Sequence, residues 1–225
     1  MKLNLPKPYL SYSQLDLWRR NPEQYRQRYY LNAPSFENNE TIFGKKIAKM
    51  LEEMASKKNW SDADLKKLGV SREQYLILKK VPRLKSSEHR IELPVGGVPF
   101  LGVLDTFSPH FRRIGEYKTG KQPWDDVRVR KHDQLVVYSL LTKLKYGRVD
   151  PWLWLAWLET RYGTEMQTIG SRSMEGESNQ LELVDVKPRV FWRRVVEWER
   201  VAMAKKIRDA ALEISKDYSN FQKSL

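Results

Sequence analysis

The pattern of hydrophobic and polar residues has a helical period through the first third of the chain. Residues 11–30 carry an apolar stripe whose spacing predicts a helix, and Pro22 divides it into two pieces because proline cannot donate a helical hydrogen bond. A second helix is predicted over residues 42–55, and two short helices over 57–80. We expect the short pair to form a helical insertion over about 57–82.

From residue 89 the period changes to two, which is typical of strands with one buried face. Strands are predicted over residues 89–95, 98–107 and 112–118, and the glycine pair at 96–97 makes the first turn between them. These strands form an antiparallel meander. The pattern leaves their register open, so the ends of the second and third strands are neighbours only if the register aligns them.

Both periods occur in the middle of the chain. Residues 119–130 are polar and basic and are predicted to form a loop, and residues 131–145 a helix that stops at Gly147. The apolar run at 152–159 is typical of a strand buried on both faces, although its length and pattern also fit a helix.

The last third begins with a polar segment, residues 163–178, which contains three glycines and is predicted to be a mobile loop or a hairpin. A short strand is expected over 180–186. One long basic helix is expected over 188–218, with Pro188 in its first turn. The whole pattern indicates a single α/β domain over residues 1–225, with a central mixed sheet flanked by helices.

Composition narrows the class of protein. The chain has 225 residues and no cysteine, which excludes disulfides, thiolate zinc sites and iron–sulfur clusters. Its first residues, interrupted by two prolines, do not resemble a signal peptide, and its most apolar stretch, 152–158, is too short to span a bilayer. We therefore expect a cytoplasmic or nucleoid-associated protein (in the host cytoplasm if phage-encoded) without a membrane partner.

The formal net charge of +13 is spread over nearly every segment, which favours a polyanion as the partner, nucleic acid before an anionic membrane surface. Arginines beside aromatic rings can hold a nucleic-acid strand by phosphate pairing and base stacking. A packed helix pair with a generic basic surface is the alternative. The candidate nucleic-acid-binding residues are Arg19, Arg20, Tyr25, Lys121, Trp124, Arg128 and Arg130.

The chemistry concentrates around Glu116 and Lys118, which project side by side if their segment is a strand, because strand residues two apart share a face. Asp105 can join them from the preceding strand. Two carboxylates and a lysine suit a hard divalent cation held beside a phosphate. Gln134 and Tyr138, four residues apart, share one face of the following helix.

Four segments in this order resemble the PD-(D/E)XK nuclease superfamily and, within it, the RecB-type nuclease domains. The match covers most of the chain. The segments are Leu10–Leu15 with Asn21–Tyr25, then Phe43–Ala48, then Leu101–Asp105 with Ile114–Gly120, and finally Gln134 with Tyr138.

The resemblance implies a restriction-endonuclease-like core and a DNA nuclease. Asp105 and Glu116 would hold Mg²⁺ or Mn²⁺, and Lys118 would orient or help deprotonate the attacking water. Gln134 and Tyr138 would complete the catalytic set by positioning the site or by hydrogen bonds to the nucleic-acid backbone. The implied substrate is DNA, single-stranded or at its ends, cut by an exonuclease or a single-strand-preferring enzyme. Repair, recombination and phage-type processing are the implied settings, with a helicase or recombinase as a possible partner.

Two departures from the family pattern bear on function. Ala48 stands where relatives carry a metal-binding histidine, and Glu52 or Glu53, about one helical turn later, is a candidate replacement. Asn21 stands where many relatives carry the first cysteine of an iron–sulfur cluster, so no cluster is expected. The alternatives to an active nuclease are a nucleic-acid-binding relative without cleavage and a subunit that acts with a helicase or recombinase.

Overall fold

The computed structural model of the chain describes residues 3–34, 38–57, 59–84, 86–147, 150–169, 172–184 and 188–224. Of residue 87 and of the segments 163–169 and 172–180, only the backbone is described.

A seven-stranded mixed sheet forms the centre of the molecule. β3 pairs along one edge with β2, and along the other with β1 at its start and β4 at its end. β4 and β5 run parallel, and the other edge of β5 pairs with β7 and then β6. The strands are β1 (Leu10–Ser11), β2 (Ser86–Val95), β3 (Val98–Phe107), β4 (Arg113–Gly120), β5 (Trp152–Ile169), β6 (Arg172–Leu183) and β7 (Arg189–Arg193).

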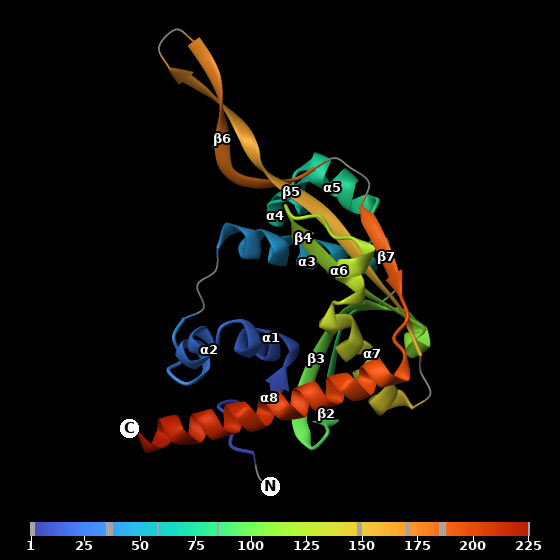
Figure 1. Ribbon diagram of the computed structural model, residues 1–225. Helices are drawn as coiled ribbons and strands as arrows, with labels where there is room; N and C mark the ends of the chain where they lie inside the picture. Colours follow the sequence, from blue (N-terminus) through green and yellow to red (C-terminus); the bar gives the residue numbers. More distant parts are fainter. Residues whose placement is uncertain are drawn as a thin grey trace.

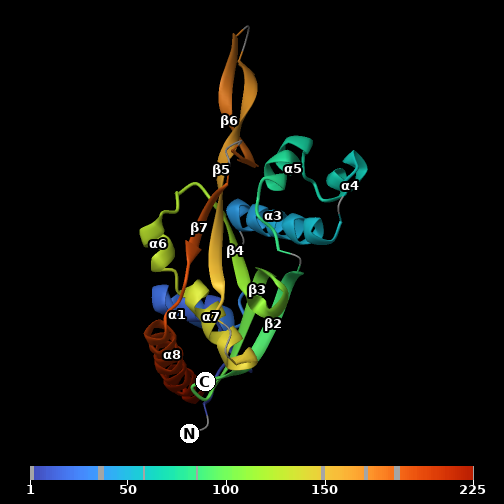
Figure 2. The ribbon, with the colours of Figure 1, turned by 90° about the vertical axis from the view of Figure 1, so that its right-hand side faces the viewer.

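The helices cover both faces of this sheet, as predicted for an α/β fold. Figure 2 shows α3, α4 and α5 on one side of the sheet and α7 and α8 on the other. None of the described helices is long and apolar enough to cross a bilayer. The helices are α1 (Tyr12–Arg20), α2 (Pro22–Tyr29), α3 (Asn39–Ser56), α4 (Asp62–Lys67), α5 (Arg72–Lys79), α6 (Asp126–Arg130), α7 (Asp133–Tyr146) and α8 (Glu197–Lys223), with a 3-10 turn at Pro109–Phe111.

The apolar run of β5 serves two hydrophobic clusters. Leu153 and Leu155 point into the cluster under α7 and α8, while Trp154 and Ala156 point into the cluster under α3 and α5. This strand is therefore buried on both faces, which confirms the strand and rules out the helix at 152–159. Its parallel neighbour β4 is reached through α6 and α7, the crossover that a parallel pair requires.

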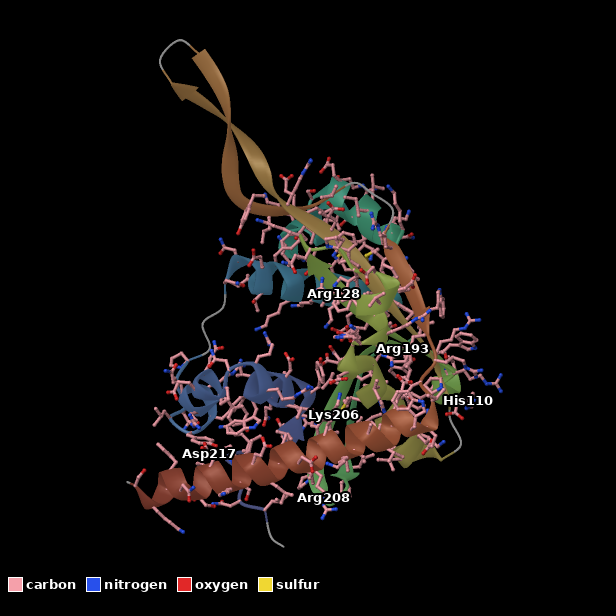
Figure 3. The ribbon with its side chains drawn as sticks, in the orientation of Figure 1. His110, Arg128, Arg193, Lys206, Arg208 and Asp217 are labelled. Carbon is pink, nitrogen blue, oxygen red and sulfur yellow. The ribbon has the colours of Figure 1, made fainter. Side chains whose placement is uncertain are left out.

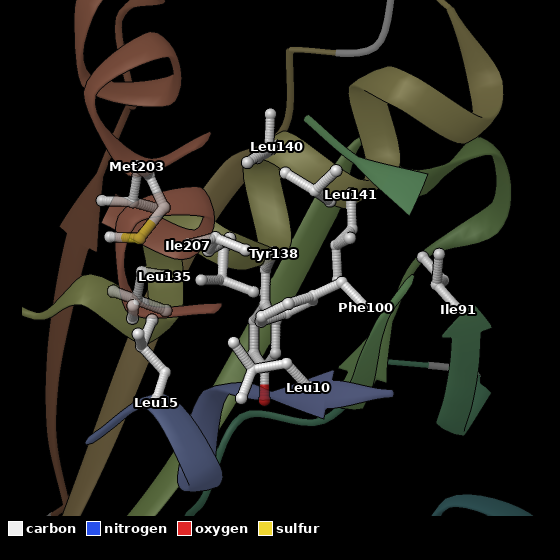
Figure 4. Packing of buried hydrophobic residues seen from close by; sticks show 14 of the residues in the cluster. Leu10, Leu15, Ile91, Phe100, Leu135, Tyr138, Leu140, Leu141, Met203 and Ile207 are labelled. Carbon is white, nitrogen blue, oxygen red and sulfur yellow. The ribbon is translucent and has the colours of Figure 1, made fainter. Parts of the chain in front are cut away.

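Figure 4 shows the larger cluster beside α7. The ring of Tyr138 lies among apolar side chains, with its hydroxyl oxygen directed out of them. Burying such side chains supplies most of the stability that holds α7 on the sheet. The side chains labelled there are Leu10, Leu15, Ile91, Phe100, Leu135, Tyr138, Leu140, Leu141, Met203 and Ile207.

The amino-terminal helices form as predicted. Ser11 caps α1 by accepting a hydrogen bond from the backbone of Gln14 at 3.4 Å. Asn21 ends α1 and caps α2, where its side chain accepts from the backbone of Gln24 at 3.0 Å, and Pro22 occupies the first turn. The capping boxes of Ser61 and Ser71 likewise open α4 and α5, the two helices expected as an insertion.

In the second half of the chain, the structure corrects two predictions and decides between the two alternatives of a third. The segment at 119–130 is not wholly a loop, since α6 forms where the side chain of Asp125 accepts from the backbone of Arg128 at 2.7 Å. The carboxyl-terminal helix begins at Glu197 and not at 188, because residues 189–193 pair with β5 as β7. Of the two structures predicted for 163–178, the hairpin is confirmed: β5 and β6 project from the molecule in Figure 1.

Helix α8 crosses the molecule and holds the amino-terminal helices in place (Figure 1). Arg26 of α2 makes two hydrogen bonds, each of 2.9 Å, to the carboxylate of Asp217. The hydroxyl of Tyr30 donates to the same carboxylate at 2.9 Å, and the backbone N–H of Asn4 donates to Ser215 at 2.8 Å. These contacts fix α1 and α2 beside the sheet, where they form a wall of the site described next.

Candidate active site

Asp105 and Glu116 come together where the β3–β4 ladder ends. The last paired residues are Thr106 and Gly115, so Asp105 and Glu116 are the next residues of the two antiparallel strands. Asp105 Oδ2 accepts a hydrogen bond of 3.0 Å from the backbone N–H of Tyr117, which satisfies a donor on the β3 side of β4. The register that the sequence left open is therefore one that makes the two carboxylates neighbours.

Four side chains close a hydrogen-bonded ring at this point. Lys118 Nζ donates to Glu116 Oε1, and at 2.9 Å to Gln134 Oε1. Gln134 Nε2 donates to the hydroxyl of Tyr138 at 2.7 Å, and that hydroxyl donates to Glu116 Oε2 at 2.6 Å. Gln134 and Tyr138 share a face of α7, and Glu116 and Lys118 share a face of β4, so each element contributes two members. We call these four residues the site ring.

Burial and the charge of Glu116 shift the pKa values of Asp105, Lys118 and Tyr138. Burial, followed by the charge of Glu116, raises the pKa of Asp105 well above its usual range. Burial acts to lower the pKa of Lys118, but Glu116 outweighs it and the pKa is raised. Burial and Glu116 also raise the pKa of Tyr138 well above its usual range. Lys118 and Tyr138 therefore act as hydrogen-bond donors here.

The first turn of α7 is held by α1, by α8 and by Trp124 from the segment before α6. Asp133 accepts from Arg19 of α1 at 2.9 Å and from Lys206 of α8 at 3.2 Å. Figure 3 labels Lys206 on the stretch of α8 that passes α1. His132 caps this turn, with its ring against the edges of Tyr12 and Trp124. These contacts set the position of Gln134.

A cleft of about 780 Å³ opens over Asp105, Lys118, Gln134 and Tyr138, and we call it the active-site cleft. Its walls come from the segment before β1, from α1 and α2, and from β3. The other lining residues are Lys7, Tyr9, Ser11, Tyr12, Ser13, Gln14, Asp16, Leu17, Arg20, Arg28, Tyr29, Leu101, Gly102 and Val103. A second cleft of about 460 Å³, the α3 cleft, shares Lys118 and is walled by the first half of α3.

Two of the predicted nucleic-acid contacts are corrected by burial. Tyr25 has 0% of its surface exposed and packs against Trp18 and Tyr30, so it is a core residue. Trp124 is only 9% exposed, with Arg128 over its ring at 4.2 Å and the ring of His132 against it. Trp124 therefore supports Arg128 and presents no open face to a base.

The remaining predicted contacts lie at the surface. Arg20 lines the active-site cleft and pairs with Asp16 at 2.6 Å, whereas Arg19 does not line it and is paired with Asp133. The other three predicted contacts are exposed cations that follow Lys118 in the sequence, just after β4 and along α6, where Figure 3 labels Arg128. They are Lys121, Arg128 and Arg130.

The α3 positions considered for the metal lie differently with respect to the clefts. Ala48 lines the α3 cleft beside Lys118, so the position expected to carry a histidine does lie next to the site. Glu52 lines neither cleft, and its role as a substitute ligand stays a prediction. In the described part of the chain, no three His, Asp or Glu side chains group closely enough to hold a metal ion by themselves.

Asp16 is a site residue that the sequence did not reveal. It lies in the active-site cleft, and its charge helps to raise the pKa of Lys118. Tyr12, Asp16 and Arg20 are spaced by four residues, so they present one face of α1 to the cleft. That spacing was a usable signal, although nothing in the sequence indicated which face of α1 meets the sheet.

Asp105 in the active-site cleft and the buried Glu116 beside it form a donor set that fits a hard divalent cation. Asp105 and Glu116 offer carboxylate oxygens, the ligands that Mg²⁺ and Mn²⁺ prefer. Burial, and then the charge of Glu116, raises the pKa of Asp105, and a cation bound between the two carboxylates would oppose that shift. Since Mg²⁺ usually keeps several waters, two protein ligands are a sufficient set.

No protein-family model and no curated protein sequence matches the chain. Its fold, however, is similar to a crystal structure of a "Putative exonuclease" from Eubacterium rectale. The TM-score is 0.55 at 14% sequence identity, and the match covers 94% of this chain and 82% of the other. The similarity establishes the fold over nearly all of the chain.

Proposed function

We propose that the chain is a metal-dependent deoxyribonuclease, an exonuclease or single-strand-preferring enzyme that hydrolyses phosphodiester bonds. The observation that carries the proposal is the site ring of Glu116, Lys118, Gln134 and Tyr138, closed beside Asp105 at the floor of a cleft. A surface ion pair between Glu116 and Lys118 would need neither a buried tyrosine nor a cleft. The name of the similar crystal structure supports the same class of activity.

The residues divide the work as follows. Asp105 and Glu116 would hold Mg²⁺ or Mn²⁺, which when bound neutralises charge that develops on the phosphate. Lys118 has three N–H donors and uses two within the ring, so a third is left for a phosphate oxygen or the attacking water. Gln134 and Tyr138 are positioning residues, because they fix Lys118 and Glu116.

The biological setting belongs to the same proposal. DNA repair, recombination or phage-type DNA processing would supply ends and single strands. A helicase or recombinase partner would deliver the strand, and the basic residues of the chain would bind it without regard to sequence. The cytoplasm, or the nucleoid, is where such substrates occur.

A cleavage-deficient nucleic-acid-binding protein is the second candidate, favoured by Ala48. Alanine places no ligating atom in the α3 cleft beside Lys118. Replacing Ala48 by histidine is expected to tighten Mn²⁺ binding about tenfold, because it adds one ligand next to the carboxylates. Calorimetric titration with Mn²⁺ measures this, and Ala55→His, later on the same helix, is the control. Equal affinities for the two variants would show that position 48 does not face the metal.

The decisive experiment is cleavage of labelled single- and double-stranded DNA with Mg²⁺, Mn²⁺ or EDTA. We expect the wild-type chain to cut with metal only, and Glu116→Gln and Lys118→Ala to lose at least a hundredfold in rate. Glu92→Gln, an exposed carboxylate paired with Arg90 on β2, is the matched control.

Two results would change the proposal. A wild-type chain that binds DNA but cuts with no metal would leave the binding protein as the function. A Glu116→Gln variant that cuts as fast as the wild type would show that the chemistry lies elsewhere in the chain.

A further inference from the structure

The active-site cleft extends far beyond the reacting residues. The segment before β1 and helix α2 contribute Lys7, Tyr9, Arg28 and Tyr29 to its lining, and we call these four the distal subsite. The position of β1 gives the distance between the distal subsite and Asp105. Leu10, next to Tyr9, pairs with Phe100, which precedes Asp105 by five residues on β3. At about 3.4 Å per residue, β1 lies roughly 17 Å along the strand from Asp105.

Cations and aromatic rings are interleaved in the distal subsite. Arg28 lies over the ring of Tyr29 at 5.4 Å, and Arg90 of β2 lies over the ring of Tyr9 at 5.5 Å. The two tyrosines are neighbours, because Tyr9 contributes, after burial, to raising the pKa of Tyr29.

Charge also distinguishes the distal subsite from the cleft floor. The floor holds Asp105 and, opposite it, Asp16, whose carboxylate already neutralises Arg20 at 2.6 Å. Within the described part of the chain, by contrast, no carboxylate forms an ion pair with Arg28 or Lys7. Positive charge at the far end is thus available to an anion from outside the protein.

We propose that the distal subsite binds an unpaired nucleotide of the substrate, several nucleotides from the bond that is cut; this rests on the proposed nuclease function. Arg28 and Lys7 pair with a backbone phosphate, and the base takes the place of Arg90 on the ring of Tyr9, whereas Tyr29, held between Tyr25 and Arg28, supports Arg28. Such stacking accepts any base, so the subsite measures strand length and single-strandedness and does not select a sequence.

Stacking on Tyr9 favours a single strand over a duplex. The ring of Tyr9 can stack on a base only where that base is unpaired and unstacked from its neighbours, because the bases of a duplex stack on one another, and the whole active-site cleft holds about 780 Å³. One strand at the stacked rise of about 3.4 Å per nucleotide covers roughly 17 Å with five nucleotides, and an extended strand covers it with fewer.

The test compares Arg28→Gln with the wild type on single-stranded DNA of twelve nucleotides and on a dinucleotide. We expect the Kd for the longer strand, measured by fluorescence anisotropy in EDTA, to rise about tenfold, and KM with Mg²⁺ to rise equally with little change in kcat. The dinucleotide is too short to span the cleft, so its KM should change less than about twofold. Tyr9→Leu should weaken the longer strand similarly.

Arg72→Gln is the matched control, because Arg72 lies over Tyr75 at 5.3 Å on α5, away from the cleft. Longer-strand affinities that are the same for Arg28→Gln and Arg72→Gln would overturn the subsite, as would an equal loss for a duplex of the same sequence. If the wild type cuts neither substrate with any metal, the nuclease function fails, and the anisotropy measurements still decide whether the subsite binds a strand.

Discussion

The hydroxyl of Tyr138 is the smallest group on which the site ring depends. It accepts from Gln134 and donates to Glu116, whose side chain is 3% exposed, so Glu116 cannot turn to water for a replacement. Hydrogen bonds to a buried charge contribute about 1.5–3 kcal/mol each. Loss of this one oxygen therefore loosens both the carboxylate and the glutamine that hold Lys118.

Tyr138→Phe tests this dependence without disturbing the packing of the ring. We expect a fall in the single-turnover cleavage rate of about ten- to a hundredfold, since one charge-assisted hydrogen bond is lost. Tyr146→Phe is the control, because Tyr146 lies on the same helix and its hydroxyl meets His89 at 2.8 Å, away from the ring. Equal rates for the two variants would remove Tyr138 from the machinery.

His132 links the site to the pH dependence of stability. Burial is the largest cause that lowers its pKa, from 6.5 to about 4. Between these two pH values the unfolded chain binds the proton and the folded chain does not, so the free energy of unfolding falls as the pH falls. The loss by pH 4 is expected to be about 2 kcal/mol, allowing for partial exposure of the ring.

The measurement is urea unfolding of the wild type and His132→Gln at several pH values. The raised pKa of Asp105 acts with the opposite sign, because the folded chain then binds the extra proton, so only the difference between the two proteins reports on His132. A difference that stays constant from pH 7 to pH 4 would contradict the prediction.

At the scale of elements, two glycines set how closely the layers approach β3 and β4. A Cβ added at Gly115 would lie 2.1 Å from the ring of Trp154, a buried side chain that cannot move aside. A Cβ added at Gly102 would lie 2.3 Å from Cδ1 of Leu141, the flexible end of a side chain on α7. The first contact holds β4 against the indole, next to Glu116.

Gly115→Ala is therefore expected to cost about 2–3 kcal/mol of unfolding free energy, and Gly102→Ala about 1 kcal/mol or less. Denaturant unfolding of both variants gives the comparison, in which each serves as the other's control. A larger loss for Gly102→Ala would mean that the indole of Trp154 adapts more easily than the leucine.

The elements also show what the sequence can and cannot predict. The pattern of apolar residues predicted both ends of β3 correctly and also the burial of β5 on both faces. Both features can be predicted because they depend only on residues that are close together in the sequence. The same pattern wrongly included residues 189–193 in the last helix. Those residues form a strand because they pair with the free edge of β5, which lies far away in the sequence. Tyr25 was misjudged for the same reason: an aromatic residue among arginines looks alike whether it faces solvent or the core.

The same limit applies to the site. Glu116, Lys118, Gln134 and Tyr138 were singled out by spacing, because two strand residues two apart and two helix residues four apart each share a face, and the resemblance to the nuclease family gave them their expected roles. Their closure into one ring, and the register that brings Asp105 to Glu116, depend on how separate elements pack. Asp16 and the distal subsite depend on the placement of α1 and α2, which the contacts with α8 determine.

At the scale of the whole molecule, the net charge of +13 should make binding to DNA strongly dependent on salt. For single strands, the slope of log K against log salt is about −0.7 for each phosphate that the protein neutralises. Lys121→Gln and Arg130→Gln should each make the slope less steep by about 0.7, the contribution of one phosphate contact. Lys205→Gln, whose ammonium is paired with Asp209 on α8, should leave it unchanged. Fluorescence titrations from 50 to 300 mM NaCl measure these slopes, and a salt-independent affinity would contradict the electrostatic account.

The position of Lys118 has a consequence for how the protein exists before it meets a metal. Its ammonium is bound to Glu116 inside the fold, so the carboxylate already has a resident counter-ion. Folding then needs no metal, unlike in small zinc domains, whose structure forms only with the ion. Under the proposed function, a divalent cation binds to a carboxylate that already has this internal partner, so its binding does not have to create new structure. Under the proposed function, the chain would therefore be folded and inactive until metal is supplied, and the supply of metal would set when it becomes active.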